Sequence, residues 1–222
     1  MEKKKICELC TPRAGYAFDS KKFTTSGYQV IRMGNLYGGT LDLQRSPVFI
    51  SKDDVDDLVL KRALLKDDDI LITLTGTKYK RDYGYAVCIN GEKDLLVNQR
   101  ILCLSPTESV DKDFMLYYLR SELFRDIFFS CETGGVNQGN VSSKFVENIE
   151  LKVPSVLEQK EIAKILKGMM ESEETAKNIA EDTIVSIDII KKSILAKAFR
   201  GELGTNEPED ESAIDLLKRH LS

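Results

Sequence analysis

Residues 154–201, PSVLEQKEIAKILKGMMESEETAKNIAEDTIVSIDIIKKSILAKAFRG, decide the architecture of this chain. Ser155 and Glu158 have the spacing of a capping box, which predicts the start of a helix. Lys197 suits the carbonyl end of a helix, and Gly201 offers a left-handed cap. A helix between these limits would be about 65–70 Å long, several times the usual length in a globular domain. Something outside the domain must cover such a helix.

The apolar residues of this segment follow a heptad pattern. With position a at Leu166, most a and d positions are apolar, while Glu173 interrupts the pattern near mid-length. The predicted dimerisation residues are Leu166, Met169, Ala176, Ala180, Ile187, Ile190 and Ile194. The small side chains of Ala176 and Ala180 would let a second helix approach closely. The alternative is a long helix folded back on its own domain, and the pattern favours pairing.

Composition is that of an ordinary soluble protein. The chain has 222 residues, a net charge of -4 and 42% hydrophobic residues, which suits one domain with an appendage or two small domains. The N-terminal residues contain lysines but no apolar run long enough for a signal peptide, and no segment approaches the length of a membrane span. We therefore expect a cytoplasmic protein.

Cysteine and histidine usage argues against a metal site. Cys7 and Cys10 form a CxxC pair, but the sequence has no second pair, and its only histidine is His220. Five cysteines without scaffold spacing do not indicate a disulfide framework. We expect buried thiols in strands and in a first turn, and no bound metal.

Residues 1–153 have the mixed pattern of an α/β (α+β) domain. Short β-branched or alternating runs, bounded by turn residues, predict strands at 29–33, 69–74, 85–89, 99–104 and 149–153. Residues 111–130 have helical spacing, with Asp111 as the expected N-cap. The expected organisation is a domain at 1–153, a helical spacer at 154–201 and an acidic tail with a short helix at 202–222.

No motif of a known catalytic chemistry is present. LTGTKYK lacks the Gly-Lys-Ser/Thr ending of a phosphate loop, and there is no dinucleotide-binding GxGxxG, no GxSxG elbow and no metal-binding histidine pair. Catalysis by carboxylates alone stays open, but no pair of carboxylates stands out. We therefore name no catalytic residue and no metal ligand.

Three polar segments instead suit nucleic acid. Residues 75–84, TGTKYKRDYG, combine cations that neutralise phosphates with rings that stack; the candidates are Lys78, Tyr79, Lys80, Arg81 and Tyr83. Residues 133–143, TGGVNQGNVSS, supply amides that pair with adenine edges, at Asn137, Gln138 and Asn140. A third polar loop is expected to carry Arg13, Lys21 and Lys22. Each segment alone is also compatible with a solvated turn, and the acidic net charge argues against tight DNA binding by this chain alone.

These segments resemble a known family in their order along the chain. The similar pieces are VIRMGN (30–35), residues 39–43, KDDDILITLTG (66–76), LVNQ (96–99), GGVNQGNVSS (134–143), IELKVPSVLEQKEIAKIL (149–166) and SILAKAFRGELGTNEPEDESAIDLL (193–217). Together they resemble half of a specificity subunit of type I restriction-modification systems. The junction P-x-x-x-E-Q-x-x-I and the AFRGEL segment are the most specific pieces. Full specificity subunits carry two recognition domains and two helices, whereas this chain has one of each.

The resemblance implies both a fold and a function. The fold would be a target-recognition domain with a twisted, mainly antiparallel sheet and short helices, followed by a long coiled-coil helix. The function would be non-catalytic recognition of a bipartite, inverted-repeat DNA site by a homodimer, within a complex with methyltransferase (M) subunits and, in restricting systems, restriction (R) subunits. S-adenosylmethionine would bind the M subunit, which modifies adenine at N6, so no cofactor is expected in this chain. Similar recognition domains occur in other defence methyltransferases.

Two alternatives remain at the level of sequence. One is a truncated recognition-domain cassette that acts only as a structural or interaction protein. The other is an enzyme of a type that no motif reveals. A neighbouring gene for an adenine methyltransferase would favour the recognition subunit over both.

Overall fold

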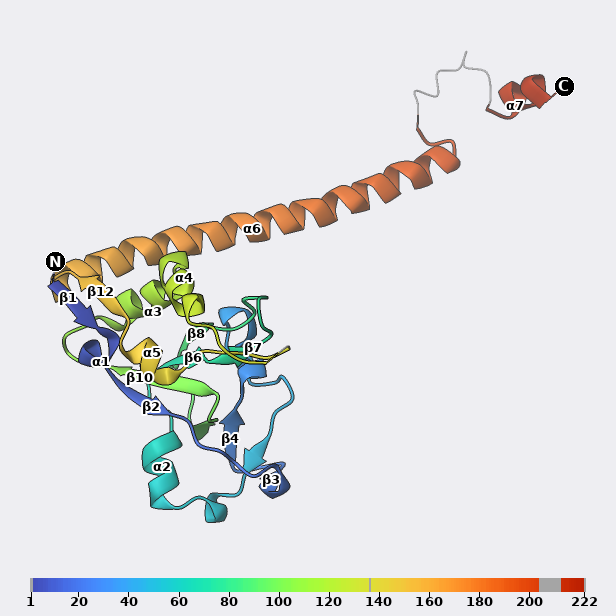
Figure 1. The fold of residues 1–222 in the computed structure, drawn as a ribbon. Coiled ribbons are helices and arrows are strands. Elements are labelled where there is room, and N and C mark those ends of the chain that lie inside the picture. Colours follow the sequence, from blue (N-terminus) through green and yellow to red (C-terminus); the bar gives the residue numbers. More distant parts are fainter. Residues whose placement is uncertain (1, 136, 204–212, 222) are drawn as a thin grey trace. The chain divides into compact units, whose positions relative to one another are not determined.

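The computed structural model describes residues 2–135, 137–203 and 213–221 (Figure 1). Its contacts divide the chain into two units, Met1–Leu166 and Lys167–Ser222, and each unit is described by itself. The predicted acidic segment falls mainly on residues 204–212, which lie outside the described residues.

The first unit is built on short, mainly antiparallel sheets. One four-stranded sheet has the order β2 (Cys10–Ala14), β10 (Ile101–Pro106), β6 (Ile70–Thr73), β8 (Ala86–Cys88). A second has the order β3 (Phe23–Thr24), β5 (Phe49–Ile50), β4 (Tyr28–Ile31), β9 (Leu95–Val97), and its β4–β9 pair is parallel. Two-stranded sheets pair β1 (Glu2–Lys5) with β12 (Glu150–Val153), and β7 (Thr75–Gly76) with β11 (Gly139–Asn140). The expected fold class is confirmed.

Short helices complete this unit. They are α1 (Ile6–Leu9), α2 (Asp57–Ala63), α3 (Lys112–Arg120), α4 (Glu122–Ser130) and α5 (Ser143–Glu147), with 3-10 turns η1 (Ser20–Lys22), η2 (Met33–Gly39) and η3 (Lys52–Asp54). The expectation of helix at 111–130 needs one correction, because the chain breaks between α3 and α4. Ser121 lies there with an extended backbone, and its Oγ accepts a hydrogen bond from Phe124 N (3.2 Å). This serine caps a new helix instead of continuing the old one.

Strands β6 and β10 are buried on both faces and separate two hydrophobic clusters. Ile70 and Ile72 pack in a cluster with residues of α1, α3 and α4. Leu71, which points to the opposite face, packs in a cluster with residues of β4 and β9. The antiparallel register places Ile101 opposite Thr73 and Leu104 opposite Ile70, so β10 follows the same alternation. The central sheet is therefore covered by helices on one face and by the second sheet on the other.

Arg13 lies in this central sheet, not in the polar loop that was expected. It is part of β2, and its Nη2 contacts Asp69 Oδ2 at 2.5 Å in an ion pair whose side chains are 18% and 2% exposed. Arg13 Nη1 also donates to the Leu64 carbonyl (2.9 Å). Asp69 accepts further hydrogen bonds from Lys66 N (2.8 Å) and Ser105 Oγ (2.5 Å). The expected loop position of Arg13 is wrong, and the residue joins β2 to the turn before β6.

The cysteines follow the expectation only in part. Cys10, Cys88 and Cys103 are buried, and burial raises the pKa of the Cys10 and Cys103 thiols to about 12. Cys7 and Cys131 are exposed, contrary to the expectation of buried thiols. No group of three or more potential metal-ligating residues occurs among the residues described.

The long helix α6 spans Val156–Phe199, which is 44 residues. Its start has the predicted capping box: Ser155 N donates to Glu158 Oε2 (2.9 Å), and Glu158 N donates to Ser155 Oγ (3.4 Å). Gln159 is fully buried; its Nε2 donates to the Pro154 carbonyl (3.0 Å), and its Oε1 accepts from Asp111 N (2.7 Å). This amide therefore fixes the first turn of α6 to the N-terminal end of α3.

The second unit continues α6 and ends in a short helix. Gly201 follows α6 with a φ of 70°, the left-handed conformation expected of its cap. Helix α7 covers Ala213–Leu221. No helix in the described ranges is long and apolar enough to span a membrane.

Replacing Asp69 by Asn tests the role of the buried ion pair. Asp69→Asn leaves the Arg13 guanidinium without its counter-charge, and we expect a loss of about 3 kcal/mol in the free energy of unfolding. The matched control is Asp68→Asn, which removes only a half-exposed ion pair with Lys112 and should cost below about 1 kcal/mol. Asn tolerates the positive φ of Asp68. Urea unfolding measures both, and equal losses would contradict the assignment.

Candidate nucleic-acid interface

Two of the polar segments predicted from the sequence lie side by side. β7 begins the basic loop at 75–84 and pairs with β11, which belongs to the Gly-rich loop at 133–143. The basic loop also reaches across to the Gly-rich loop, where Lys78 Nζ donates to the Gly134 carbonyl (3.1 Å). The Gly-rich loop closes on itself through reciprocal backbone bonds between Thr133 and Asn140 (2.9 Å each). Cations and amides from distant parts of the sequence therefore share one surface.

Glu132 fixes the basic loop from the side of the Gly-rich loop. Its carboxylate accepts hydrogen bonds from Tyr83 Oη (2.7 Å) and from Tyr79 N (3.2 Å). A Cβ added to Gly139 would collide with the Glu132 carboxylate and would lie 2.8 Å from Tyr83 Oη, so a side chain at this position would displace the hydrogen-bonded carboxylate. The loop is thus held by the Glu132 side chain at its base and not only by its own turn.

The loop also has internal bonds that set its shape. Asp82 Oδ1 accepts a hydrogen bond from Thr77 N (2.8 Å), which closes the loop. Desolvation opposes ionisation of Asp82, but the hydrogen bonds from Thr77 outweigh it and lower the pKa of the carboxyl. Tyr79 and Arg81 have left-handed φ values of 64° and 52°, as a tight loop without glycine at these positions requires. Tyr79 is 81% exposed, and Lys78 Nζ lies 5.1 Å from the centroid of its ring.

Tyr83 supports the loop from inside the hydrophobic core. It is 1% exposed and packs edge to face on Phe128 and Phe129, with centroid distances of 5.7 and 4.9 Å. Burial, and then the hydrogen bond to Glu132, raise the pKa of its hydroxyl. In this conformation no face of Tyr83 is available to DNA, and its function is to hold the loop.

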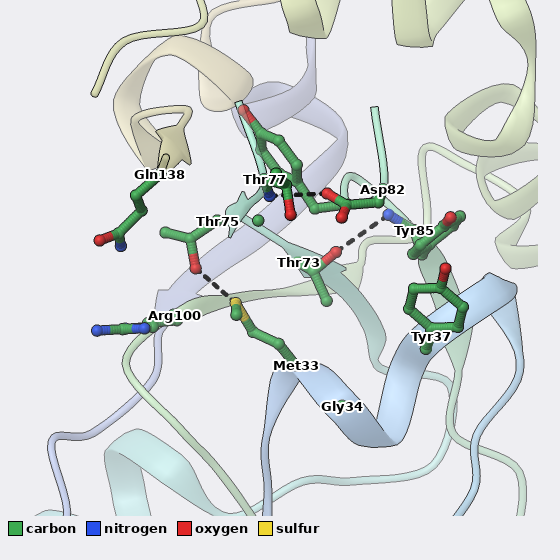
Figure 2. A pocket seen from close by; sticks show the side chains of 12 residues that line it. Met33, Gly34, Tyr37, Thr73, Thr75, Thr77, Asp82, Tyr85, Arg100 and Gln138 are labelled. Atoms are coloured by element: carbon green, nitrogen blue, oxygen red, sulfur yellow. Dashed lines mark hydrogen bonds between the residues drawn. The ribbon is translucent and has the colours of Figure 1, made fainter. Parts of the chain in front are cut away.

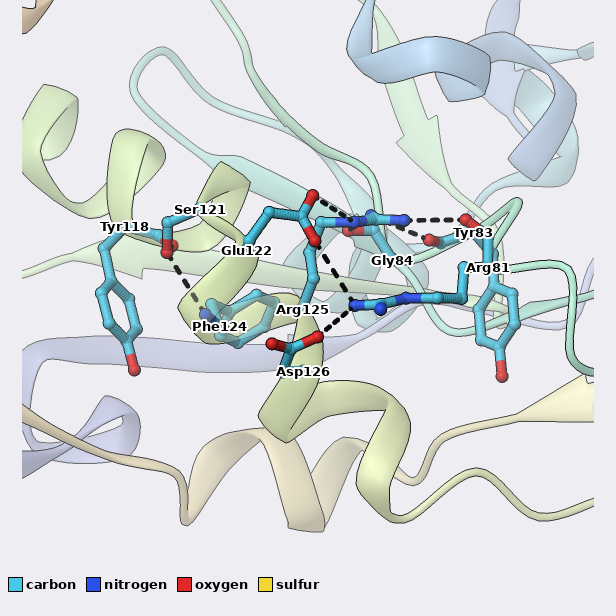
Figure 3. A network of polar contacts seen from close by, with 9 residues as sticks. All are labelled: Arg81, Tyr83, Gly84, Tyr118, Ser121, Glu122, Phe124, Arg125 and Asp126. Atoms are coloured by element: carbon cyan, nitrogen blue, oxygen red, sulfur yellow. Dashed lines mark hydrogen bonds and ion pairs between the residues drawn. The ribbon is translucent and has the colours of Figure 1, made fainter.

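Two arginines join helix α4 to the basic loop, Arg125 from the helix and Arg81 from the loop (Figure 3). Arg81 contacts Asp126 Oδ1 (2.8 Å) and Glu122 Oε2 (3.6 Å), and its guanidinium lies 5.0 Å from the centroid of Phe129. Arg125 donates to the carbonyls of Arg81 (2.7 Å), Tyr83 (3.2 Å) and Gly84 (3.3 Å). Arg81 therefore already has acidic partners. Its neighbour Lys80 is exposed as well, but no ion pair of Lys80 occurs among the described residues.

Beside these loops lies a groove made of two adjoining hollows. One hollow has a volume of about 320 Å³ and is lined by residues of η2, β6, β7 and the basic loop, together with Gln138 (Figure 2). The other has a volume of about 610 Å³ and is lined by residues of η1, η2 and the turn before β10. The two hollows share Met33, Gly34 and Arg100, and we call them together the recognition groove.

Three arginines line the recognition groove, at Arg32, Arg45 and Arg100. Sequence reasoning missed all three, because they are isolated in the sequence and come from separate elements. Amide side chains accompany them, from Asn98, Gln99 and Gln138. Guanidinium and amide groups are the side chains that pair with base edges, so the groove can read nucleic acid by hydrogen bonding.

The remaining predicted residues lie at the rim or away from the groove. Lys21 and Lys22 are exposed in η1, next to Ser20, which lines the larger hollow. Asn137 and Gln138 are exposed, whereas the backbone of Asn140 is held in the pair with Thr133. Arg13 lies in the central sheet and lines neither hollow.

Comparison with known proteins gives consistent similarities. A family model described as "Type I restriction modification DNA specificity domain" matches residues 1–181. The Escherichia coli specificity subunits of the EcoBI and EcoKI type I restriction enzymes are each 24% identical, over 177 and 182 residues; each match covers 80% of this chain but 36% and 38% of the relative. The HsdS subunit of Thermoanaerobacter tengcongensis has a similar fold, with a TM-score of 0.64 and 19% identity, covering 91% of this chain and 45% of that one. The chain therefore spans less than half the length of these relatives.

Removing the Glu132 carboxylate tests how the basic loop is held. We expect Glu132→Ala to speed amide hydrogen exchange at Tyr79 and its loop neighbours by roughly 10- to 100-fold, since a hydrogen bond to a charged group contributes about 1.5–3 kcal/mol. The matched control is Glu161→Ala, which removes an exposed glutamate of α6. Loop exchange that is the same in both variants would show that Glu132 does not hold the loop.

Proposed function

The chain belongs to the family of type I restriction modification DNA specificity domains, and from this membership we propose that it selects the DNA sequence on which a type I restriction-modification complex acts. The observation that carries the proposal is the recognition groove, where three arginines and the amides of Asn98, Gln99 and Gln138 line adjoining hollows. The exposed Lys80 and Tyr79 lie on the basic loop at 75–84, whose Asp82 and Thr77 line the smaller hollow. This arrangement combines phosphate contacts at the rim with base contacts inside.

The proposed role is recognition without chemistry. The lining of the groove is rich in groups that donate or accept hydrogen bonds, from arginines, amides, tyrosines, hydroxyl side chains and Asp82. We assign methyl transfer from S-adenosylmethionine to adenine N6 to M subunits, and DNA cleavage to R subunits where the system restricts. The site of action of this complex would be the cytoplasm, where the chromosome lies.

We propose that two copies of the chain pair through α6. The d-position residue Met169 is 64% exposed, and Ile187, Ile190 and Ile194 are 54%, 56% and 50% exposed. Apolar side chains of this size in one heptad seam favour a helix partner that removes them from water. Ala176 and Ala180, also exposed, lie at mid-length, where a close crossing is sterically allowed. In an antiparallel pair related by a two-fold axis, each seam would contact its own copy and the recognition domains would lie at opposite ends.

Charge substitution in the seam tests this pairing. Ile187→Asp with Ile190→Asp would bury unpaired carboxylates in the helix pair, so we expect the dimer of the isolated chain to dissociate at micromolar concentration. The matched control is Ile189→Asp, at position c of the same heptad, where the side chain is 62% exposed. Sedimentation velocity without the M subunit measures both variants. A monomeric wild type in the presence and absence of M, or a dimer that resists the double substitution, would contradict pairing through this seam.

The proposed dimer determines the form of the recognised site. Two identical domains related by a two-fold axis read the same bases on opposite strands, so the motif should consist of two identical, inverted half-sites with an unread spacer. A helix of 44 residues is about 66 Å long, and one turn of DNA is about 34–36 Å, so half-sites should lie about one to two turns apart.

Methylome sequencing of a strain that contains only this chain and its M subunit tests the function. We expect methylated adenines in one split palindrome, and a shorter spacer when one heptad is deleted from α6. No sequence-dependent methylation would refute the recognition role and leave a structural or interaction role. An asymmetric bipartite motif would show that a different specificity chain is the partner.

A further inference from the structure

The backbone around Arg100 is fixed by bonds from several elements. Leu74 N donates to the Arg100 carbonyl (3.0 Å), which ties this residue to the end of β6. Asn98 N donates to the Ile31 carbonyl (3.0 Å), and Gln99 N donates to the Tyr16 carbonyl (3.0 Å). The turn from Asn98 to Arg100 is therefore attached to both four-stranded sheets and to the segment that follows β2.

This turn is also closely packed against its neighbours. A Cβ added to Gly15 would collide with the Asn98 carbonyl, so the segment after β2 packs directly on the turn. Immediately after Arg100 the chain enters β10, whose residues Ile101 and Leu102 are fully buried. The backbone of Arg100 is thus held by hydrogen bonds and packing at the edge of the core, although its side chain is exposed.

Arg100 differs from the other two arginines of the recognition groove in its partners. Arg32 Nη2 donates to the Ser46 carbonyl (2.7 Å). The Arg45 guanidinium lies over the ring of Tyr37, 5.2 Å from its centroid. Within the described part of the chain, the Arg100 guanidinium makes no hydrogen bond, ion pair or ring contact. Among the three arginines of the groove, it is the one whose guanidinium has no such partner among the described residues, so both its N–H donors and its planar faces are available to a ligand.

Its position in the groove is central. Arg100 lines both hollows, and its side chain extends on the same side of the smaller hollow as that of Gln138 (Figure 2). A guanidinium presents two parallel N–H donors, which match the O6 and N7 acceptors of guanine in the major groove. Because the Cα of Arg100 is already fixed, forming such a pair requires only the side chain to be ordered and not the backbone.

We propose that Arg100 is a specificity-determining residue that reads one guanine of each half-site by a bidentate hydrogen bond. This assignment rests on the proposed function, and it separates Arg100 from the residues that contact phosphates. We assign Lys78 and Lys80 of the basic loop to phosphate contacts, because a lysine ammonium is a point charge that neutralises a phosphate without reading a base.

Binding measurements on the complex of full-length chain and M subunit test the assignment. The probe is a set of duplexes in which each base pair of the methylated half-site is varied in turn, with affinity measured at several salt concentrations. The variants are Arg100→Lys and Arg100→Gln, with Lys78→Ala/Lys80→Ala for comparison. The matched control is Arg62→Lys, an arginine of α2 that lines neither hollow.

The expected results differ among the variants. Arg100→Lys retains the charge but not the planar fork, so the preference for guanine at one position should fall by roughly 5- to 150-fold while the salt dependence is unchanged. Arg100→Gln should shift the preference at that position towards adenine. The double lysine variant should weaken binding to all duplexes equally and lower the salt slope by about two. Arg62→Lys should behave as the wild type.

Several results would overturn the assignment. They are a half-site without a G·C pair, an Arg100→Lys variant that retains every base preference, and an Arg100→Lys variant that weakens all duplexes equally. A wild-type complex without any base preference would instead refute the proposed function, and the Arg100 assignment with it.

Discussion

The recognition surface depends on strands β6 and β10 being buried on both faces. Because Ile70 and Ile72 pack among the helices while Leu71 packs against the second sheet, neither strand can slide or rotate without exposing apolar side chains to water. The elements that carry the groove start from these strands. β6 leads into β7 and the basic loop, and the turn that carries Arg100 leads into β10. The loops are thus short extensions of a rigid sheet, which suits a surface that must hold several hydrogen-bonding groups in fixed positions.

Charged groups at the base of the loops add a second level of order. Glu132 accepts from a buried tyrosine and from a loop amide, and Arg125 donates to three loop carbonyls. Both residues bind backbone groups of the loop, so the loop shape is fixed while the side chains of Lys80 and Tyr79 remain exposed. In Arg81 both parts of the residue are held: its carbonyl accepts from Arg125, and its guanidinium pairs with Asp126. Any contact of Arg81 with DNA must first displace this carboxylate.

The long helix could be predicted because its signals are local. The capping box at Ser155 and the glycine at 201 lie within a few residues of the helix ends, and the structure has the cap bonds and the left-handed glycine that the sequence indicates. The strands at 69–74 and 99–104 were also predicted, since β-branched runs between turn residues are local signals. The break at Ser121 was missed because helical periodicity continues across it.

The candidate site could be predicted only in part, for a related reason. The basic and Gly-rich loops were found because each concentrates polar residues in a short segment. Arg32, Arg45 and Arg100 are single residues whose proximity depends on how β4, β6 and β10 are assembled. Arg13 was expected in an exposed loop but lies in β2. Its ion-pair partner Asp69 is far away in the sequence, so no local signal indicates that Arg13 is needed inside the sheet. The sequence predicts a stacking role for the ring of Tyr83, because its contact with Phe128 joins residues that are far apart in the sequence and leaves no local signal.

A cryo-electron microscopy structure of the chain with its M subunit and a duplex containing the methylated motif tests the central claim most directly. We expect base edges of the major groove to lie against the recognition groove. The guanidinium nitrogens of Arg100 should lie within about 2.7–3.2 Å of O6 and N7 of a guanine, and the loop at 75–84 should contact phosphates. DNA bound to another face of the domain, such as the surface of α2, with the recognition groove open to solvent, would contradict the account.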